Sequence, residues 1–338
     1  MSTPVSSHAA AGALRGVRAT HMPPNLVNTN PLRWSPHRLL RMLVVGATVC
    51  LATTTRAQDI EPRAYANAPV GFNFLVLGYA YTQGGVSFNP SLPITDPQLN
   101  TSSAVAAYAR AFALWGKSSK LDVIVPYTHL SGSAVYRGET VERRVSGFAN
   151  PAFRLTVNFL GAPALGMQEF ANYQQDLIVG ASLRVAPPWG QYDDERLVNI
   201  GTNRWTFKPE VGLSKAWGPW VAELALAATL FTDNDDFYGG NRLSQRPLYS
   251  TQGHLIYSFR SGVWVSVDAT HYTGATTSLN GASNHDLQRN WRSGATLSLP
   301  IDRQHSIKLY ASSGVTARTG NDFDLIGLAY QYRWAGGH

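Results

Sequence analysis

The sequence predicts an all-β protein, a closed up-and-down antiparallel β-barrel of about twelve strands and of the outer-membrane type. Only 14% of the residues are charged and 44% are hydrophobic, whereas soluble domains carry about 25% charged residues. No stretch reaches the roughly 18 consecutive apolar residues of a membrane-spanning helix. Alternating apolar and polar residues recur instead in segments of about 12 residues, slightly more than a tilted strand needs to cross a bilayer.

Residues 1–57 are predicted to be a leader with a signal peptide. They hold six arginines and no acidic residue, so the formal net charge of +7 belongs mainly to the leader and does not indicate a nucleic-acid partner. An apolar run at 42–52 follows two arginines, and a small-x-small cleavage pattern follows at 55–57. The true start of translation could be Met42 or Met22, which the sequence leaves open.

The single cysteine, Cys50, lies in the apolar run of the leader. A lipoprotein signal needs a small residue before its cysteine, and Val49 stands there instead, so a lipid anchor is disfavoured. The mature chain from Gln58 onward has no cysteine, which excludes disulfides, thiolate metal sites and cysteine nucleophiles. Residues 58–69 are predicted to be a short periplasmic tether before the barrel.

Period-2 patterning predicts the strands of the barrel, which spans residues 70–334. In 153–159, for example, Phe, Leu, Val and Phe alternate with Arg, Thr and Asn. In 177–185 the one apolar residue on the polar face is Ile178. The predicted strands are 70–82, 103–115, 120–131, 148–160, 174–186, 204–216, 219–232, 248–260, 262–273, 289–300, 304–316 and 322–334.

The connections favour a barrel over a soluble sandwich, because short turns alternate with long polar loops as in outer-membrane barrels. The short ones are 116–119, 217–218, 261 and 302–303, and the long ones are 132–147, 233–247 and 274–288, with 317–321 as a brief member. Only the 161–173 connection breaks the rule. A further hairpin there or in 83–102 would change the strand count by two. Closure removes the edge strands that so apolar a sheet would have to protect.

The last predicted strand has Gly327 followed by alternating aromatics up to Trp334, and residues 335–338 overhang. A strand of this kind is what the barrel-assembly machinery reads. Aromatic residues near the strand ends predict two interfacial girdles. One girdle consists of Trp115, Trp217, Trp220 and Tyr257, and the other consists of Tyr127, Trp205, Trp291 and Tyr249.

A specific sequence block begins with PPWGQYD at 187–193 and continues with LVNIG at 197–201, NRW at 203–205 and KPE at 208–210. Supporting motifs stand at 125–127, 233–235 and 318–323. On these motifs the chain, from about 70 to 334, resembles the outer-membrane family of meta-pathway phenol-degradation proteins, also labelled transporters. It departs at 147–151, where relatives tend to have a second Gly and an Asp before Pro, and Asn150 stands here.

The resemblance implies a barrel associated with aromatic or other small organic compounds, although a shared fold does not establish a substrate. If the apolar face meets lipid, the polar face lines the lumen, and Arg110 and Asp176 are expected there too. Counting across the 217–218 turn places Glu210 opposite Ala225. The lumen-lining candidates are Arg154, Arg184, Arg204, Lys208, Glu210, Glu223, His254, Asp268, Arg292 and Lys308.

Two interpretations of these charges remain open. They could form ion-pair ladders that fill a small lumen, because an unpaired buried charge is costly. Alternatively, the excess of basic residues could bias the pore toward anions such as carboxylated or phenolate compounds. The acidic loop 233–236 could bind Ca²⁺ but lacks the Gly and distal Glu of an EF-hand loop, so no metal site is predicted.

The predicted function is an outer-membrane channel for passive uptake or efflux of small organic compounds, aromatic or anionic, without cofactor or enzyme activity. Its expected partners are outer-membrane lipid, lipopolysaccharide, the barrel-assembly machinery and the solutes. A structural or adhesive barrel with a plugged lumen is the alternative. A lipid hydrolase is disfavoured, because the only hints of one are Thr273 with His271 and Ser283 with His285, and no Gly-x-Ser-x-Gly elbow occurs.

Overall fold

The computed structural model describes residues 61–84, 95–136, 138–316 and 323–336. The chain divides into two units, Met1–Thr53 and Thr54–His338, and every described residue belongs to the second. The predicted leader, with Cys50 and the alternative starts, lies outside the described residues. So do the predicted loop 317–321 and the last two residues of the C-terminal overhang.

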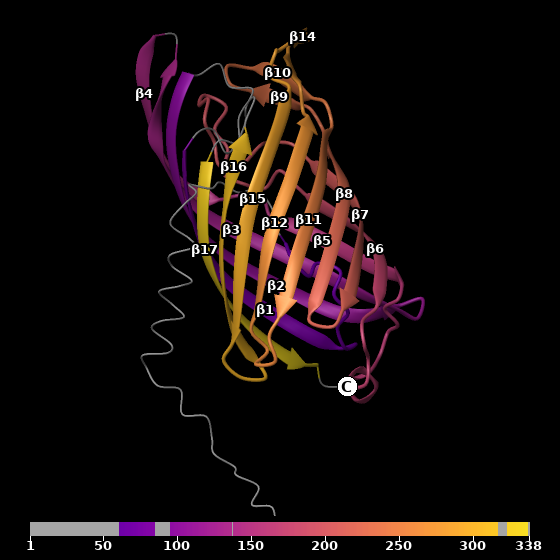
Figure 1. The fold of residues 1–338 in the computed structure, drawn as a ribbon. Helices are drawn as coiled ribbons and strands as arrows, with labels where there is room; N and C mark the ends of the chain where they lie inside the picture. The colour runs from indigo at the N-terminus through magenta and orange to yellow at the C-terminus, as the bar shows by residue number, and fades with distance from the viewer. Residues whose placement is uncertain (1–60, 85–94, 137, 317–322, 337–338) are drawn as a thin grey trace, which may run out of the picture. The chain divides into compact units, whose positions relative to one another are not determined.

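Twelve strands of the described chain close into an antiparallel barrel, which confirms the predicted fold (Figure 1). Closure follows because β1 pairs with both β17 and β2, while β3 pairs with β2 and β5. The barrel strands are β1 (Phe72–Gly84), β2 (Thr95–Leu114), β3 (Lys117–Tyr136), β5 (Ala152–Leu160), β6 (Leu177–Ala186), β7 (Thr206–Trp217), β8 (Trp220–Phe231), β11 (Leu248–Ser258), β12 (Trp264–Gly274), β15 (Gln288–Pro300), β16 (His305–Thr316) and β17 (Phe323–Ala335).

The long loops carry further strands at the end of the barrel away from the C-terminus (Figure 1). β4 (Glu139–Phe148) forms a hairpin with the far half of β3, whereas β5 pairs with the near half. A separate small sheet consists of β9 (Asn234–Phe237), β10 (Asn241–Gln245), β13 (Thr277–Leu279) and β14 (Ala282–Ser283). The predicted polar loops are therefore largely ordered hairpins.

The exceptional connection between β5 and β6 contains a single short helix, α2 (Met167–Phe170). It lies near the start of the barrel, where the backbone N–H of Val70 donates to the carbonyl of Leu165 at 2.8 Å. No helix in the described part of the chain is long and apolar enough to cross a membrane.

Two strands are longer than the sequence predicts. β2 begins at Thr95 and β3 continues to Tyr136, whereas the predicted segments begin at 103 and end at 131. The extra pairs join polar residues such as Asn100 and Ser131. In these extensions the outer face is polar while the inward-facing Leu99 is apolar and packs against Ile200, so they lack the apolar-outside alternation that reveals a barrel strand in the sequence.

The register of the β7–β8 hairpin differs from the predicted one by two residues. Glu210 pairs with Ala227 and not with Ala225, because Trp217 and Trp220 are the last paired residues. Gly218 has a φ of 54° and Pro219 follows it. A positive φ at the first central residue with Pro at the second matches a type II′ turn, so the turn consists of residues 218 and 219.

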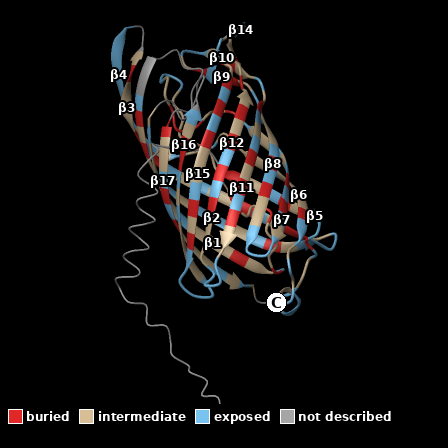
Figure 2. Cartoon of the chain, viewed as in Figure 1, coloured by how far each residue is buried: buried red, intermediate tan, exposed pale blue. Residues whose placement is uncertain are grey.

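Side chains of the barrel wall are apolar outside and polar inside, and burial alternates along the strands (Figure 2). On β7, Val211 is 53% exposed on the outer face while Ser214 is fully buried on the inner face. This arrangement is typical of barrels that face lipid. Of the eight predicted girdle aromatics, all except Tyr257 are exposed, and the Tyr257 ring packs 4.8 Å from that of Trp220.

Candidate functional site in the barrel lumen

Residues 61–69, here called the N-terminal segment, lie within the lumen. The sequence predicts a tether here, but the segment bonds to the barrel wall along its length. The backbone N–H of Arg63 donates to Glu223 Oε2 at 2.7 Å. Asn158 Nδ2 donates to the carbonyl of Tyr65 at 3.1 Å, and Lys120 Nζ donates to that of Ala64 at 3.5 Å.

Tyr65 is the anchor of the N-terminal segment. Its ring lies over Gly180 and Gly212, which are cross-strand partners on the inner face of β6 and β7. It belongs to an apolar cluster with Ile178 and Ala225. Its hydroxyl donates to Glu210 Oε1 at 2.9 Å, so the ring is buried and its polar end is satisfied.

The side chain of Arg63 reaches β11 and β12. Its guanidinium donates to Ser258 Oγ at 2.6 Å and lies 4.9 Å from the ring centre of Trp264. Its φ of 68° lies in the left-handed region, which residues other than glycine rarely adopt. Such a conformation costs about 1–3 kcal/mol and persists only where the surroundings impose it.

Three basic residues stand side by side on the inner wall, and we call them the basic row. Arg154 on β5 pairs in register with Arg184 on β6, which pairs with Lys208 on β7. The row continues to Asp122 on β3, which accepts a hydrogen bond from Arg154 Nε at 2.7 Å. Adjacent like charges across strands are destabilising, so this row requires acidic partners.

Two further carboxylates supply these partners. Glu210 Oε2 lies 3.3 Å from Lys208 Nζ. Glu61 of the N-terminal segment accepts a hydrogen bond from Arg154 Nη1. Burial would raise the pKa of the Glu61 carboxyl, but Arg154, with Arg184 and Lys120, holds it below its usual value. Burial and the charge of Glu210 raise the pKa of Tyr65, so Tyr65 is neutral and Glu61 charged at neutral pH.

A second group of polar side chains lies across β8, β11 and β12. His254 Nδ1 lies 2.6 Å from Asp268 Oδ1, and both side chains are almost completely buried. Ser266 Oγ donates to Asp268 Oδ2 at 3.1 Å. Ser214 Oγ donates to Glu223 Oε1 at 2.9 Å. These bonds satisfy the buried polar groups of this wall.

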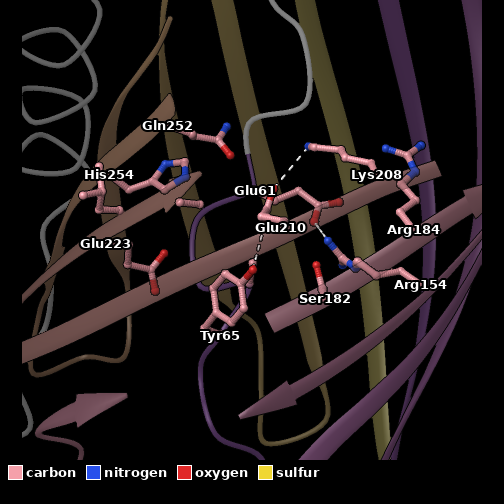
Figure 3. Close-up of a pocket in the computed structure, with 13 residues that line it drawn as sticks. Glu61, Tyr65, Arg154, Ser182, Arg184, Lys208, Glu210, Glu223, Gln252 and His254 are labelled. Atoms are coloured by element: carbon pink, nitrogen blue, oxygen red, sulfur yellow. Dashed lines mark hydrogen bonds and ion pairs between the residues drawn. The ribbon is translucent and has the colours of Figure 1, made fainter. Parts of the chain in front are cut away.

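Between the N-terminal segment and the wall lies a small cavity of about 30 Å³ (Figure 3). The basic row lines one side, and Glu223, Gln252 and His254 line the other. Figure 3 shows Glu61 and Tyr65 pointing toward these groups. Ligand pockets usually measure about 300–1,000 Å³, so a small organic molecule fits beside the basic row only when the N-terminal segment withdraws.

The loop 187–205 covers the other end of the lumen, and it contains most of the family-like sequence block. Ile200 packs against the inward-facing Leu99 and Leu130. Arg143 Nε donates to the carbonyl of Val198 at 3.2 Å. The buried Asn234 donates to Tyr192 Oη at 2.8 Å. The block thus builds a fixed cover over the mouth.

Arg204 is buried at the base of this cover. Its guanidinium donates to Gln245 Oε1 and lies 4.6 Å from the ring centre of Phe231. Burial lowers the pKa of Arg204 to about 10 although Asp233 and Tyr192 act to raise it. Arg204 therefore remains a cation at neutral pH and holds the cover to the barrel rim.

The structure brings six of the ten predicted lumen residues to the cavity, namely Arg154, Arg184, Lys208, Glu210, Glu223 and His254. Asp268 contacts His254, and Lys308 Nζ lies 5.7 Å from the ring centre of Trp264. Arg292 is buried apart from them, where it donates to the carbonyl of Phe323 at 3.1 Å.

Two further predicted lumen residues were assigned to the wrong place. Arg110 is exposed on the same face of β2 as Tyr108, which is the outer face. The inner face of β2 consists largely of Ala there, so the alternation does not tell the two faces apart. Asp176 precedes β6 and pairs with Lys215 outside the lumen.

Sequence reasoning missed Glu61, Tyr65, Lys120 and Asp122. One signal could have revealed the N-terminal segment. Ile178 is apolar on an otherwise polar face. Gly180 is the next residue on that face, and Gly212 is the cross-strand partner of Gly180. Small and apolar residues inside a polar lumen indicate that another part of the chain packs there.

Other proposed chemistry finds little support. In the described residues no three His, Cys, Asp or Glu gather as metal ligands. Asp233 and Asp235 of the acidic loop both pair with Arg242. The ring of His271 packs 4.8 Å from that of Trp291 on the outer face, and Ser283 Oγ donates to the carbonyl of Asn284 at 3.5 Å.

Comparison with known proteins supports the barrel. A family model described as "Putative MetA-pathway of phenol degradation" matches residues 78–332. The chain is similar to an outer membrane channel from Pseudomonas putida F1, with a TM-score of 0.68 and 17% identity over 82% of this chain and 100% of that one. The transport unit of the autotransporter AIDA-I from Escherichia coli matches with a TM-score of 0.47 and 10% identity, over 87% and 97% of the two chains. No curated protein matched.

Proposed function

Because the chain belongs to the family of MetA-pathway phenol-degradation proteins, whose model matches residues 78–332, we propose that it is an outer-membrane channel for passive diffusion of small organic compounds. The fold that it shares with an outer membrane channel supports this proposal. So do its apolar outer face and its two aromatic rims, which suit insertion into lipid.

The observation that carries the proposal is the basic row inside the lumen. Arg154, Arg184 and Lys208 stand on three neighbouring strands and line the cavity. When the N-terminal segment withdraws with Glu61, these three cations face only Glu210 and Glu223 among the described carboxylates of the cavity lining. A narrow passage with an excess of one sign of charge concentrates solutes of the opposite sign. The proposed solutes are therefore small aromatic carboxylates and phenolates, in keeping with the phenol degradation of the family description.

Passage requires the N-terminal segment to move, because it bonds to strands from β3 to β11: Lys120 donates to Ala64, and Arg63 donates to Ser258. The described contacts that hold the segment are a few hydrogen bonds, the ion pair of Glu61 with Arg154 and one aromatic ring. A typical hydrogen bond contributes only about 0.5–1.5 kcal/mol net. The segment can therefore leave the lumen without unfolding of the barrel.

A structural or adhesive barrel with a permanently closed lumen is the second candidate. The fit of Tyr65 into the notch at Gly180 and Gly212 favours it, as does the cover made by loop 187–205. Such a barrel would hold its segment at all times and pass no solute. The two candidates thus make opposite statements about permeability.

Liposomes that contain the purified protein test the proposal, with benzoate, phenol and glucose as solutes. A heat-dependent shift in gel mobility verifies that the barrel is folded. We expect benzoate to enter faster than glucose and faster than into empty liposomes. Folded protein without entry of any solute above empty liposomes would support the closed structural barrel instead.

Export and assembly belong to the same proposal. The predicted signal peptide directs export, β17 addresses the barrel-assembly machinery, and lipopolysaccharide surrounds the end that carries β4. Fractionation of cells checks this placement, because the protein should sediment with outer membranes. Recovery from the soluble fraction would contradict it.

A further inference from the structure

The basic row shares its carboxylate partners with the barrel wall and with the N-terminal segment. Among the described strands, Asp122 contacts Arg154 and Lys120, and Glu210 contacts Lys208. Like charges on adjacent strands repel each other. The third negative charge comes from outside the barrel wall, from Glu61 of the N-terminal segment.

The position of Glu61 is that of a bound ligand. Arg154 Nε donates a hydrogen bond to Asp122, which fixes the orientation of the guanidinium. Arg154 Nη1 donates a second hydrogen bond to the carboxylate of Glu61. The side chain of Glu61 is 40% exposed, whereas that of Asp122 is 7% exposed. Glu61 is thus the exchangeable partner of Arg154, and Asp122 is the fixed one.

We propose that Glu61 stands in for the carboxylate of an anionic solute, which binds Arg154 in its place and thereby releases the N-terminal segment from the lumen. This inference rests on the proposed function, because it assigns the solute class and the step that opens the lumen. A carboxylate forms the same charge-assisted hydrogen bonds with a guanidinium whether it belongs to the chain or to a solute.

The surroundings of Glu61 suit a small aromatic carboxylate. The adjacent cavity of about 30 Å³ is too small for an aromatic ring while the N-terminal segment is in place. The ring of the solute therefore takes space that the segment, with the ring of Tyr65, vacates when it leaves the lumen. Benzoate, with one ring and one carboxylate, is the simplest probe of this chemistry.

The solute competes with Glu61 for Arg154, and this competition determines the solute concentration that releases the N-terminal segment. A group tethered by a short chain competes at an effective concentration in the millimolar range. Removing the charge of Glu61 removes this competitor. We therefore expect benzoate to bind roughly tenfold more tightly once Glu61 is neutral, a change of about 1.4 kcal/mol.

Calorimetric titration of benzoate into the purified full-length protein in detergent tests this inference. The variant is Glu61→Gln, and the matched control is Glu139→Gln, which neutralises an exposed carboxylate on β4. Trypsin cleavage after Arg63 gives a second readout, because release of the segment exposes that bond. Gel mobility with and without heating checks the folding of each variant.

We expect Glu61→Gln to bind benzoate roughly tenfold more tightly than wild type and Glu139→Gln to bind like wild type. Benzoate should also speed cleavage after Arg63 in wild type, while an equal concentration of glucose should not. Equal benzoate affinity in all three proteins, or no binding in any, would overturn the inference.

The binding experiment does not depend on transport, so the two proposals can fail separately. Tighter binding by Glu61→Gln without any flux into liposomes would retain the anion site and reject the channel. Flux of benzoate with unchanged affinity in Glu61→Gln would retain the channel and reject the role of Glu61.

Discussion

The ring of Tyr65 occupies the space that a side chain at Gly212 would take, since an ideal Cβ on Gly212 would lie 2.1 Å from the Cε2 atom of the ring. Gly180, directly across on β6, forms the other half of this notch. Glycine is required here because another part of the chain approaches the strand backbone. The inner wall of the barrel is therefore shaped to hold the N-terminal segment.

Gly212→Ala should weaken that hold. The added methyl group collides with the ring, so Tyr65 must leave its notch and the lumen should open more often. The mean conductance of single channels in planar bilayers measures this opening. Gly253→Ala is the control, because the nearest atom to its Cβ is 3.8 Å away. Equal conductance in both variants and wild type would contradict the role of the notch.

Tyr65 itself permits a graded test. Tyr65→Phe loses the bond of 2.9 Å to Glu210, which is worth about 1 kcal/mol and hence about fivefold in the open population. Tyr65→Ala also loses the buried ring and should open considerably more. The rate of trypsin cleavage after Arg63 reports the open fraction. The order wild type, Phe, Ala is expected, and an alanine variant as protected as wild type would reject it.

Lys208→Gln should reduce the preference for anions, because it removes one charge of the basic row. The reversal potential of single channels in a KCl gradient measures this preference. Arg144→Gln on the outer side of β4 is the charge-matched control. Arg292 is a poorer target, since its side chain is buried against Phe323. An unchanged reversal potential in Lys208→Gln would show that the row does not select ions.

Acid should loosen the N-terminal segment through Glu61. The pKa of this carboxyl is held below its usual value mainly by Arg154, against the opposing effect of burial. A lowered pKa means that the stabilisation is complete above the unfolded value of about 4.3 and fades as the pH falls further. Trypsin is inactive there, so pepsin cleavage of the segment measures the change. Wild type and Glu61→Gln should differ at pH 5, where pepsin still cleaves, and converge toward pH 2, and a constant difference would contradict this linkage.

The strands of the barrel could be predicted because lipid outside and water inside impose a period of two residues. Val211 and Ser214 show this on β7, where one is exposed and the other buried. This period of two residues is not visible on β2, because the inner face consists largely of Ala, and Arg110 was therefore assigned to the wrong face. The pattern also fails at the far ends of β2 and β3, where polar residues such as Asn100 and Ser131 pair and the inward-facing Leu99 packs against Ile200.

The candidate site could be predicted only in part. The strand pattern places Arg154, Arg184 and Lys208 on the inner face, but it does not show that they form one row, since the row depends on the register of three strands. The β7–β8 register was predicted incorrectly because the turn is Gly218 with Pro219. Glu61 and Tyr65 could not be assigned, because no periodic pattern marks a segment that enters a lumen.

A removable crosslink tests most directly the claim that the N-terminal segment controls passage. The only cysteine of the chain lies in the predicted leader, and an ideal Cβ on Gly180 lies 2.7 Å from Cδ1 of Tyr65. A disulfide between Tyr65→Cys and Gly180→Cys is therefore within reach. The account predicts no benzoate flux into liposomes while this bond is intact and flux at least equal to wild type after reduction. Equal flux before and after reduction, with the disulfide verified by gel shift, would contradict it.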